Sequence, residues 1–433
     1  MEAILSRASS GRGATLRRFA IPLLALATSL VVVALVWRSQ GLVDKRPDPY
    51  WFSAMAESLL RGEGFTAYGS MLHRRMPGYP FFIAGLYAIF GVHALAVQLA
   101  QCLLFAGTCW LVQDMGRSLY SERVGLFAGA LCALHPSLLR YVGDLHLETL
   151  FTFCITLSVW LSCRFYQKAT FKRGVALGVA WGAACLIKAV VLLYPAVFAA
   201  LFALHRWRNA ERRPALGAAL AQLLPVGAAC VAMALTISPW TARNYAVSGH
   251  FVPTTTGAGD AIMRSFVFSR TEFITLQRPP YTDAENESNA LFQALCQAQG
   301  AVWEADDIQS ERILMAEAKR RISADPGAFV KKTLIGVFTF WYQMTSLPNS
   351  LAAGGMALLA WFFAAFGLLR SRREGQPAWL VLAPVVYLNL LLAALLSLGR
   401  YSVPVLPCLL VLSAAGLDWL LARLRGPATQ DAS

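Results

Sequence analysis

The chain has 433 residues, of which 57% are hydrophobic and only 14% are charged, against about a quarter charged in soluble domains. This composition excludes a soluble globular protein and predicts an all-α integral membrane protein. The formal net charge of +14 does not indicate nucleic acid, because the basic residues form several short clusters rather than one patch.

A membrane-spanning helix needs about 20 mostly apolar residues, and about ten such runs occur along the chain. The first run is longer than the core of a signal peptide and lacks a small-x-small cleavage site, so we expect it to be retained. We treat residues 1–433 as one polytopic domain. The predicted spans are residues 17–37, 94–114, 123–142, 147–165, 173–188, 189–204, 216–238, 351–369, 377–397 and 401–422.

Alternate threading of these spans places the basic clusters on one side, and basic loops mark the cytoplasmic face of a membrane. Both termini, including the polar tail 426–433, are therefore predicted to be cytoplasmic. The outer face then carries two long segments, a first loop at 38–93 and a large loop at 239–350. We expect polar chemistry to lie there, at the membrane surface.

The first outer loop contains a predicted amphipathic helix that ends at Gly62 and Gly64. It is too short to span a membrane and should lie in the interface. Asp48 precedes Pro49, a good start signal for a helix, so local sequence favours Asp48 as a helix cap. This role is compatible with that of a catalytic base, because a capping carboxylate is held in a fixed rotamer. The apolar face comprises Phe52, Met55, Ala56, Leu59 and Leu60.

Three further stretches bear on the outer loops. The run 78–91 is apolar but short, so we predict a second juxtamembrane helix. The apolar core of 329–344 has only about twelve residues, so this stretch is predicted to be interfacial. A polar helical stretch is expected from about 283 to 323.

Acids are scarce near the membrane, which makes Asp144 and Glu148 informative. Their spacing of four predicts two carboxylates on one face of the helix that enters the membrane. The alternative role is capping, because both acids suit the positive end of a helix dipole. Glu148 lies deeper in apolar sequence, where an ionised group is costly.

Four separate segments bring a cation to the same outer level. Snorkelling to lipid headgroups explains each cation taken singly. Taken together they suit a phosphate, because cations bind phosphate oxygens strongly. The candidates for binding a donor phosphate are Arg75, with Arg74 beside it, Lys188, Arg243 and Arg400.

Metal chemistry is not predicted. His73, His146 and His250 accompany no HExxH or similar pairing, and the nine cysteines show no CxxC spacing. We expect the cysteines to be small apolar packing residues.

Six stretches in order carry a family resemblance: 48-DPYWFSAMAESLLRGEGF-65, 76-MPGYPFFIAGLYAIFG-91, Glu148, 239-PWTARNYAVSGHFVPTTTGAG-259, 325-DPGAFVKKTLIGVFTFW-341 and 400-RYSVPVLPCLLVLSAAGL-417. The first resembles the pattern D-x-x-x-Y-x-x-x-A-x-x-L-x-x-G-x-G-F. The chain resembles the polyprenyl-phosphate-sugar glycosyltransferases of the C-type fold, family 39 type. This group includes bacterial relatives of protein O-mannosyltransferases and of the lipid A aminoarabinose transferase.

The resemblance implies transfer of a monosaccharide, with inversion, from a polyprenyl-phosphate donor to a hydroxyl of a glycan, lipid or protein acceptor. It implies a bacterial inner-membrane enzyme with its active site facing the periplasm. We expect no required cofactor, and the sequence does not indicate a divalent cation. Asp48 takes the role of the base, while Asp44 lies outside the motif. Arg243, Arg400 and Lys188 would bind the donor phosphate, and Asp144 with Glu148 would line the acceptor or sugar side.

The chain departs from the family pattern at two places. Phe52 replaces the usual tyrosine, and Arg74 and Arg75 stand where aminoarabinose transferases carry an acid. Two other functions stay open, a ligase or polymerase of pyrophosphate-linked oligosaccharides and a lipid or solute transporter. Transporters usually carry mid-span ionisable groups and inverted repeats, and neither is evident in this sequence.

Overall fold

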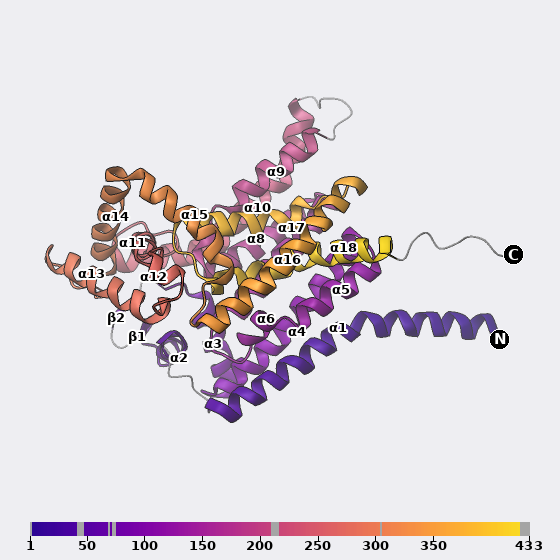
Figure 1. Ribbon diagram of the computed structural model, residues 1–433, viewed down its shortest axis with the longest axis horizontal. Coiled ribbons are helices and arrows are strands. Elements are labelled where there is room, and N and C mark those ends of the chain that lie inside the picture. The colour runs from indigo at the N-terminus through magenta and orange to yellow at the C-terminus, as the bar shows by residue number, and fades with distance from the viewer. Residues whose placement is uncertain are drawn as a thin grey trace.

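The computed structural model shows a helix bundle with a smaller helical unit at one end (Figure 1). Side chains of residues 2–18, 39–40, 47–49, 70–71 and 216–222 are not described. Asp44, His73, Arg74 and the tail 426–433 lie outside the described residues. The structure describes residues 2–40, 47–67, 70–71, 75–208, 216–303 and 305–424.

Helices follow one another along nearly the whole described chain. The N-terminal part contains α1 (Glu2–Gln40), α2 (Pro47–Leu60), β1 (Thr66–Ala67), β2 (Ser70–Met71), α3 (Gly78–Phe90), α4 (Ala94–Leu119), α5 (Glu122–Ala133), α6 (Pro136–Arg140), α7 (Glu148–Gln167) and α8 (Phe171–Ile187). The middle contains η1 (Ala189–Val191), α9 (Tyr194–Arg208), α10 (Leu216–Ser248), α11 (Ala258–Phe268), α12 (Thr271–Ile274), η2 (Pro280–Ala284), α13 (Glu285–Gln297) and α14 (Asp307–Ala324). The C-terminal part contains α15 (Pro326–Tyr342), α16 (Leu347–Glu374), α17 (Trp379–Ala394), η3 (Gly399–Val405) and α18 (Leu406–Leu424).

The described residues include seven helices that are long and apolar enough to cross a membrane, and each matches a predicted span. The all-α, multi-pass membrane fold is therefore confirmed. The other three predicted spans correspond to shorter helices. The run 173–188 forms the 17-residue α8, and 377–397 forms the 16-residue α17. The prediction of one continuous helix over 123–142 is wrong, because α5 ends at Ala133 and a second short helix, α6, begins at Pro136.

Close packing of α8 on α10 shows why α8 is rich in glycine. Gly174, Gly178 and Gly182 recur every four residues on one face of α8. A Cβ at Gly178 would lie only 2.0 Å from the carbonyl oxygen of Ala229 on α10. The two backbones can approach this closely only because these positions lack side chains.

Helix α10 is longer than expected. The predicted span ended at 238, yet the helix continues through Pro239 to Ser248. The Ser238 hydroxyl donates to the Leu235 carbonyl at 2.9 Å, which is the group that loses its helical partner at Pro239. Arg243 therefore lies on a helix and not in the loop 239–350.

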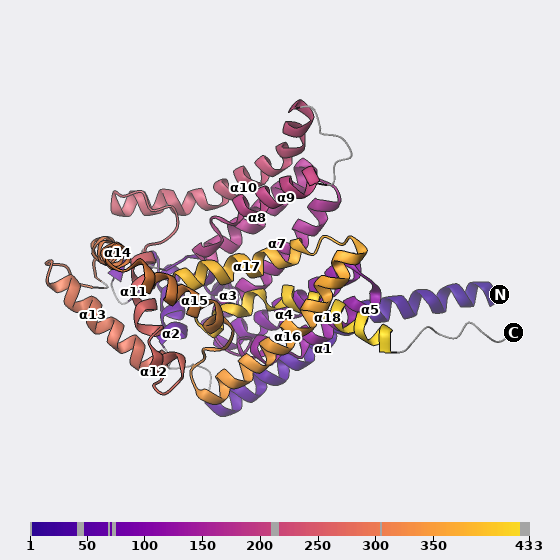
Figure 2. The same cartoon turned by 45° about the horizontal axis from the view of Figure 1, so that its top comes forward.

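The outer elements form a helical unit at the end of the bundle opposite the start of α1 and the end of α18 (Figures 1 and 2). Its small core contains Met263, Phe292, Leu314 and Ala318. The polar stretch expected from 283 to 323 is two helices and not one, because α13 ends before Gly300, which has φ +70°, and Asp306 caps α14.

Candidate active site

The turn between α6 and α7 carries the two candidate acids. Asp144 and Glu148 are 7% and 4% exposed. The predicted sharing of one helix face is wrong, because α7 begins at Glu148 and Asp144 lies before it in the turn. The cap residue of α7 is Leu147, whose side chain makes no capping hydrogen bond, and a contribution of Asp144 to this helix end stays a prediction.

Two glutamines of α4 hold this turn. Gln98 Nε2 donates to the Gly143 carbonyl at 2.7 Å, and Gln101 Nε2 donates to the carbonyls of Val142 and Asp144, both at 2.8 Å. Sequence reasoning missed both glutamines. The available signal was two amides three residues apart in an apolar run, where buried amides are costly unless hydrogen-bonded.

Lys188 and Arg400 meet at one aromatic ring, although 212 positions separate them. Lys188 Nζ lies 3.6 Å from the centroid of the Tyr401 ring, and Arg400 Cζ lies 5.2 Å from it. Arg400 Cζ also lies 5.8 Å from the ring of Tyr281, which η2 brings in from the outer unit. The structure thus brings these two predicted cations together and adds Tyr281 and Tyr401, which sequence reasoning missed.

The tyrosines link the cations to the acidic turn. Burial raises the pKa of Tyr141 well above its ordinary value, the Glu148 carboxylate adds to this rise, and the Arg400 guanidinium opposes it. Burial also raises the pKa of Tyr281, again opposed mainly by Arg400. Both acids and both cations therefore lie around one group of tyrosines, of which Tyr141 is buried and Tyr281 and Tyr401 are partly buried.

Two glycines of the motif stretches fix the cations in place. A Cβ at Gly78 would lie 2.8 Å from the carbonyl oxygen of Leu186, so only glycine lets α3 reach the end of α8, where Lys188 follows. Gly399 donates its N–H to the Gln343 carbonyl at 2.8 Å. A Cβ there would lie 2.7 Å from Met344 Sδ. Close backbone contact thus sets the position of Arg400.

Arg243 belongs to a neighbouring aromatic group. Its Cζ lies 4.9 Å from the ring of Trp240 and 5.6 Å from that of Phe65, and it donates to Asn244 Oδ1 at 3.2 Å. Trp240 Nε1 in turn donates to the Thr254 carbonyl at 2.8 Å. The contacts described for Arg243 are to this aromatic group and to Asn244, so its sharing of a phosphate with Lys188 and Arg400 stays a prediction.

Arg75 reaches the acidic turn through other side chains. Its Cζ lies 5.7 Å from the ring of Phe52, which packs edge-on against Tyr79 at 5.1 Å. The Tyr79 hydroxyl donates to Gln101 Oε1 at 2.9 Å. Phe52 therefore serves as a buried apolar contact where the family pattern carries a tyrosine.

Helix α2 buries much of the predicted apolar face, but it begins one residue earlier than Asp48. Phe52, Met55 and Ala56 are buried, whereas Leu60 is exposed. The helix begins at Pro47, so the Asp48 backbone lies in the first turn rather than at the cap. Asp48 stands one turn before Phe52, and its side chain is outside the described residues. Its catalytic role stays a prediction.

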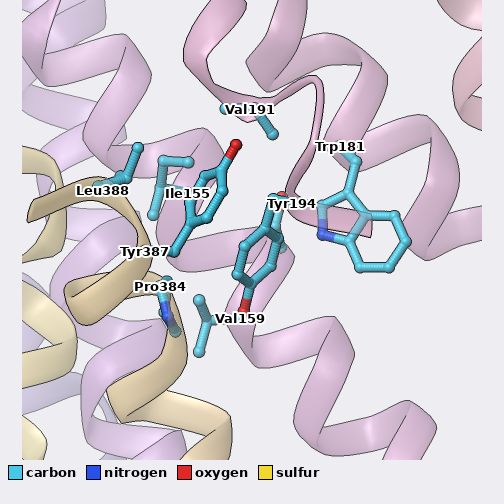
Figure 3. Close-up of a pocket in the computed structure, with 9 residues that line it drawn as sticks. Ile155, Val159, Trp181, Val191, Tyr194, Pro384, Tyr387 and Leu388 are labelled. Atoms are coloured by element: carbon cyan, nitrogen blue, oxygen red, sulfur yellow. The ribbon is translucent and has the colours of Figure 1, made fainter. Parts of the chain in front are cut away.

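A small apolar cavity lies between α7, α8, η1, α9 and α17 (Figure 3). It encloses about 10 Å³, roughly the room one water needs. Ile155 and Val159 of α7 line it together with Trp181, Tyr194 and Tyr387. Its size and lining do not suit a sugar or a phosphate. The described residues contain no group of three or more His, Cys, Asp or Glu arranged to hold a metal.

The fold is shared with solved membrane enzymes. The chain is similar to the archaeal oligosaccharyltransferase AglB from Archaeoglobus fulgidus in complex with an inhibitory peptide and a dolichol-phosphate, with 13% identity, a TM-score of 0.60 and coverage of 96% of this chain and 52% of that chain. The same enzyme tethered to an acceptor peptide gives 14% identity, a TM-score of 0.60 and coverage of 95% and 50%. ArnT from Cupriavidus metallidurans bound to undecaprenyl phosphate gives 14% identity and a TM-score of 0.42, with coverage of 95% of this chain and 80% of that chain. This chain spans about half the length of the oligosaccharyltransferase.

The chain therefore has the fold of the archaeal oligosaccharyltransferase. Residues 74–231 match the family model described as dolichyl-phosphate-mannose-protein mannosyltransferase. No curated protein is significantly similar to the chain by sequence. The family model agrees with the predicted resemblance over residues 74–231, which include two of the six stretches, the acidic turn and Lys188.

Proposed function

We propose that the protein transfers a monosaccharide from a polyprenyl-phosphate donor to the hydroxyl of an acceptor, with inversion at the anomeric carbon. The observation that carries this proposal is the meeting of Lys188 and Arg400 on the ring of Tyr401, beside the buried turn with Asp144 and Glu148. A paired cation site next to buried carboxylates suits a phosphate leaving group next to sugar hydroxyls.

The reaction needs one displacement. A carboxylate takes the proton of the acceptor hydroxyl, and the oxygen forms a bond to the anomeric carbon. The bond from that carbon to the phosphate oxygen breaks, and its electron pair leaves with the lipid phosphate. Lys188 and Arg400 stabilise the charge that develops on this phosphate. In this proposal Asp48 is the base, Asp144 and Glu148 face the sugar or acceptor, and Arg243 and Arg75 support the donor side.

The proposed location is the inner membrane of a bacterium, with both termini in the cytoplasm and the site facing the periplasm. The site lies at the end of the bundle that carries the outer helical unit, and α1 begins and α18 ends at the opposite end (Figure 1). Basic clusters at 164–173 and 370–373 also belong to the opposite end, in keeping with the distribution expected of a cytoplasmic face.

A structural neighbour supports a lipid-linked donor. The archaeal oligosaccharyltransferase is described with a dolichol-phosphate and a peptide, and these ligands are properties of that protein. Its fold makes transfer of a whole oligosaccharide from a pyrophosphate-linked lipid the second candidate. The two candidates differ in the number of phosphates that the cations must bind.

The test is transfer by the purified full-length protein in liposomes, supplied separately with polyprenyl-phosphate sugars and polyprenyl-pyrophosphate oligosaccharides. We expect product from the first class alone. Asp48→Asn should insert normally and lose at least about a hundredfold in rate, because it removes the proton acceptor. Asp283→Asn, an acid of the outer unit paired with Arg278, is the matched control and should keep full activity. Full activity of Asp48→Asn would refute its role, and product from pyrophosphate donors alone would refute the proposed function.

A further inference from the structure

The acidic turn has no helix of its own to hold it. Residues 141–147 lie between α6 and α7. The His146 N–H donates to the Asp144 carbonyl within the turn at 2.8 Å, whereas the carbonyls of Val142 and Gly143 are bound by side chains of another helix. Three consecutive carbonyls, those of Val142, Gly143 and Asp144, accept hydrogen bonds from Gln98 and Gln101 at 2.7 to 2.8 Å. The two glutamines stand three residues apart on α4, so both amides project from one face of that helix.

The amide of Gln101 has a fixed orientation. The Tyr79 hydroxyl donates to Gln101 Oε1 at 2.9 Å, and both side chains are buried. Because the oxygen of the amide is occupied, its NH₂ group faces the turn and can satisfy two carbonyls at once. Tyr79 lies on α3, so the contact connects the acidic turn to the helix that follows Arg75.

The position of Glu148 depends on this backbone. Glu148 Oε2 is buried and accepts no hydrogen bond from any described residue. No hydrogen bond therefore holds that oxygen, and its position follows the backbone at the start of α7. A shift of the turn moves the Glu148 carboxylate, and with it the Asp144 carboxylate, relative to Lys188 and Arg400.

We propose that Gln98 and Gln101 are positioning residues, a pair of amides that clamps the turn 142–144 and so sets the place of the two carboxylates at the reacting sugar. The inference rests on the proposed function. It assigns no contact with substrate to either glutamine, and Tyr79 acts in it only by orienting the Gln101 amide.

The test compares Gln101→Glu with Gln101→Leu in the full-length protein. The first keeps the shape but turns a carboxylate toward two carbonyl oxygens, and only its protonated form can donate to one of them. We expect transfer at neutral pH to fall tenfold to a hundredfold in both variants, mainly in kcat, because small misplacement of reacting groups is costly. The ratio of Gln101→Glu to wild-type activity should rise as pH falls, while that of Gln101→Leu should stay constant. The titratable groups around this position are Tyr79, which binds Gln101 directly, and Asp144, Glu148 and Tyr87, which act electrostatically on Tyr79. Each activity is therefore divided by that of the wild type at the same pH.

The matched control is Gln113 on the same helix. It is buried to a similar extent, at 5% exposed, but lies toward the opposite end of α4. Gln113→Glu and Gln113→Leu should keep transfer within about threefold of wild type. A loss equal to that of the Gln101 variants would show a general effect of altering α4 and would overturn the proposal.

Hydrogen exchange provides a readout that needs no activity. Amides of residues 141–150 should exchange faster in Gln101→Leu than in the wild type. Their exchange rates in Gln113→Leu should equal those of the wild type. Unchanged exchange in Gln101→Leu would overturn the clamp.

If the wild type transfers sugar and both Gln101 variants match it at every pH, positioning is refuted and the proposed function stands. If the wild type transfers from neither donor class while exchange responds, the proposed function fails and the clamp stands as a structural feature.

Discussion

Tyr401 is the residue on which the candidate phosphate site depends. Its ring contacts both Lys188 and Arg400. Two cations held together repel each other, and the electron-rich face of an aromatic ring partly offsets that cost. A ring in this place therefore keeps two positive charges close when no anion is bound.

Replacing Tyr401 should weaken binding of the donor. Tyr401→Leu removes a cation–π contact of about 1 to 2 kcal/mol, so KM for the donor should rise about tenfold, while Tyr401→Phe should stay close to wild type. Steady-state kinetics with varied donor measures this. Tyr245→Leu, at an exposed tyrosine of α10, is the control. Equal KM values for Tyr401→Leu and the wild type would contradict the role of the ring.

Lys332 gives the protein a pH-dependent stability. It is buried on α15 and donates to the carbonyls of Ala393 and Ala394 at the end of α17. Burial lowers the pKa of Lys332 to about 8, against about 10.4 in an unfolded chain. Between these values the unfolded state binds more protons than the folded state, so stability should rise with pH over this window.

The measurement is the thermal midpoint in detergent at pH 7 and pH 10. Lys332→Met lacks the titrating group, so its Tm relative to wild type should be higher at pH 7 than at pH 10. Lys331→Met, at the neighbouring position on the same helix, should show no such pH dependence. An equal Tm difference at both pH values would rule out the shifted pKa of Lys332.

At the scale of elements, the α8 and α10 pair shows how the bundle reaches its packing density. Gly178→Ala puts a methyl group 2.0 Å from the Ala229 carbonyl, and such overpacking costs about 1 to 3 kcal/mol or more. We expect a clear drop in Tm. Gly227→Ala on α10 meets no atom within 4 Å and should leave Tm unchanged or slightly higher, because alanine favours helix. Equal effects of the two substitutions would contradict the close approach.

Much of this element structure was predictable from local sequence. Phe52, Met55 and Ala56 repeat with the period of a helix, and all three are buried as that period predicts. The end of α5 was not predicted, because an apolar run with a single proline does not reveal whether a helix bends or stops there. The length of α10 was also missed, since Ser238 can supply the missing hydrogen bond beside Pro239 only in the folded geometry.

At the scale of the whole molecule, the outer helical unit completes the site. Tyr281 lies against Arg400, and the Tyr342 hydroxyl donates to the Ile274 carbonyl at 3.0 Å, which ties the unit to the end of α15. The site is thus assembled from α3, α4, α7, α8, η3 and η2. These elements come from nearly the whole length of the chain.

The proposed orientation can be tested by labelling intact cells. In a background without the nine native cysteines, Asp283→Cys in the outer unit should react with a membrane-impermeant maleimide, because we place it in the periplasm. Arg372→Cys should react only after the inner membrane is permeabilised. Labelling of Arg372→Cys in intact cells, with Asp283→Cys protected, would reverse the topology.

The sequence by itself determined the membrane class, the positions of most helices, a family resemblance and the set of candidate acids and cations. These follow from composition, from the helical period and from short motifs, all of which act locally along the chain. Only the tertiary structure decided that Lys188 and Arg400 share Tyr401, that Arg243 lies in a separate aromatic group, and that Gln98 and Gln101 hold the acidic turn. The physical reason is that buried carbonyls and charges are satisfied by whatever partner the fold brings within about 3 to 4 Å. That partner can lie forty or two hundred positions away, where no local pattern records it.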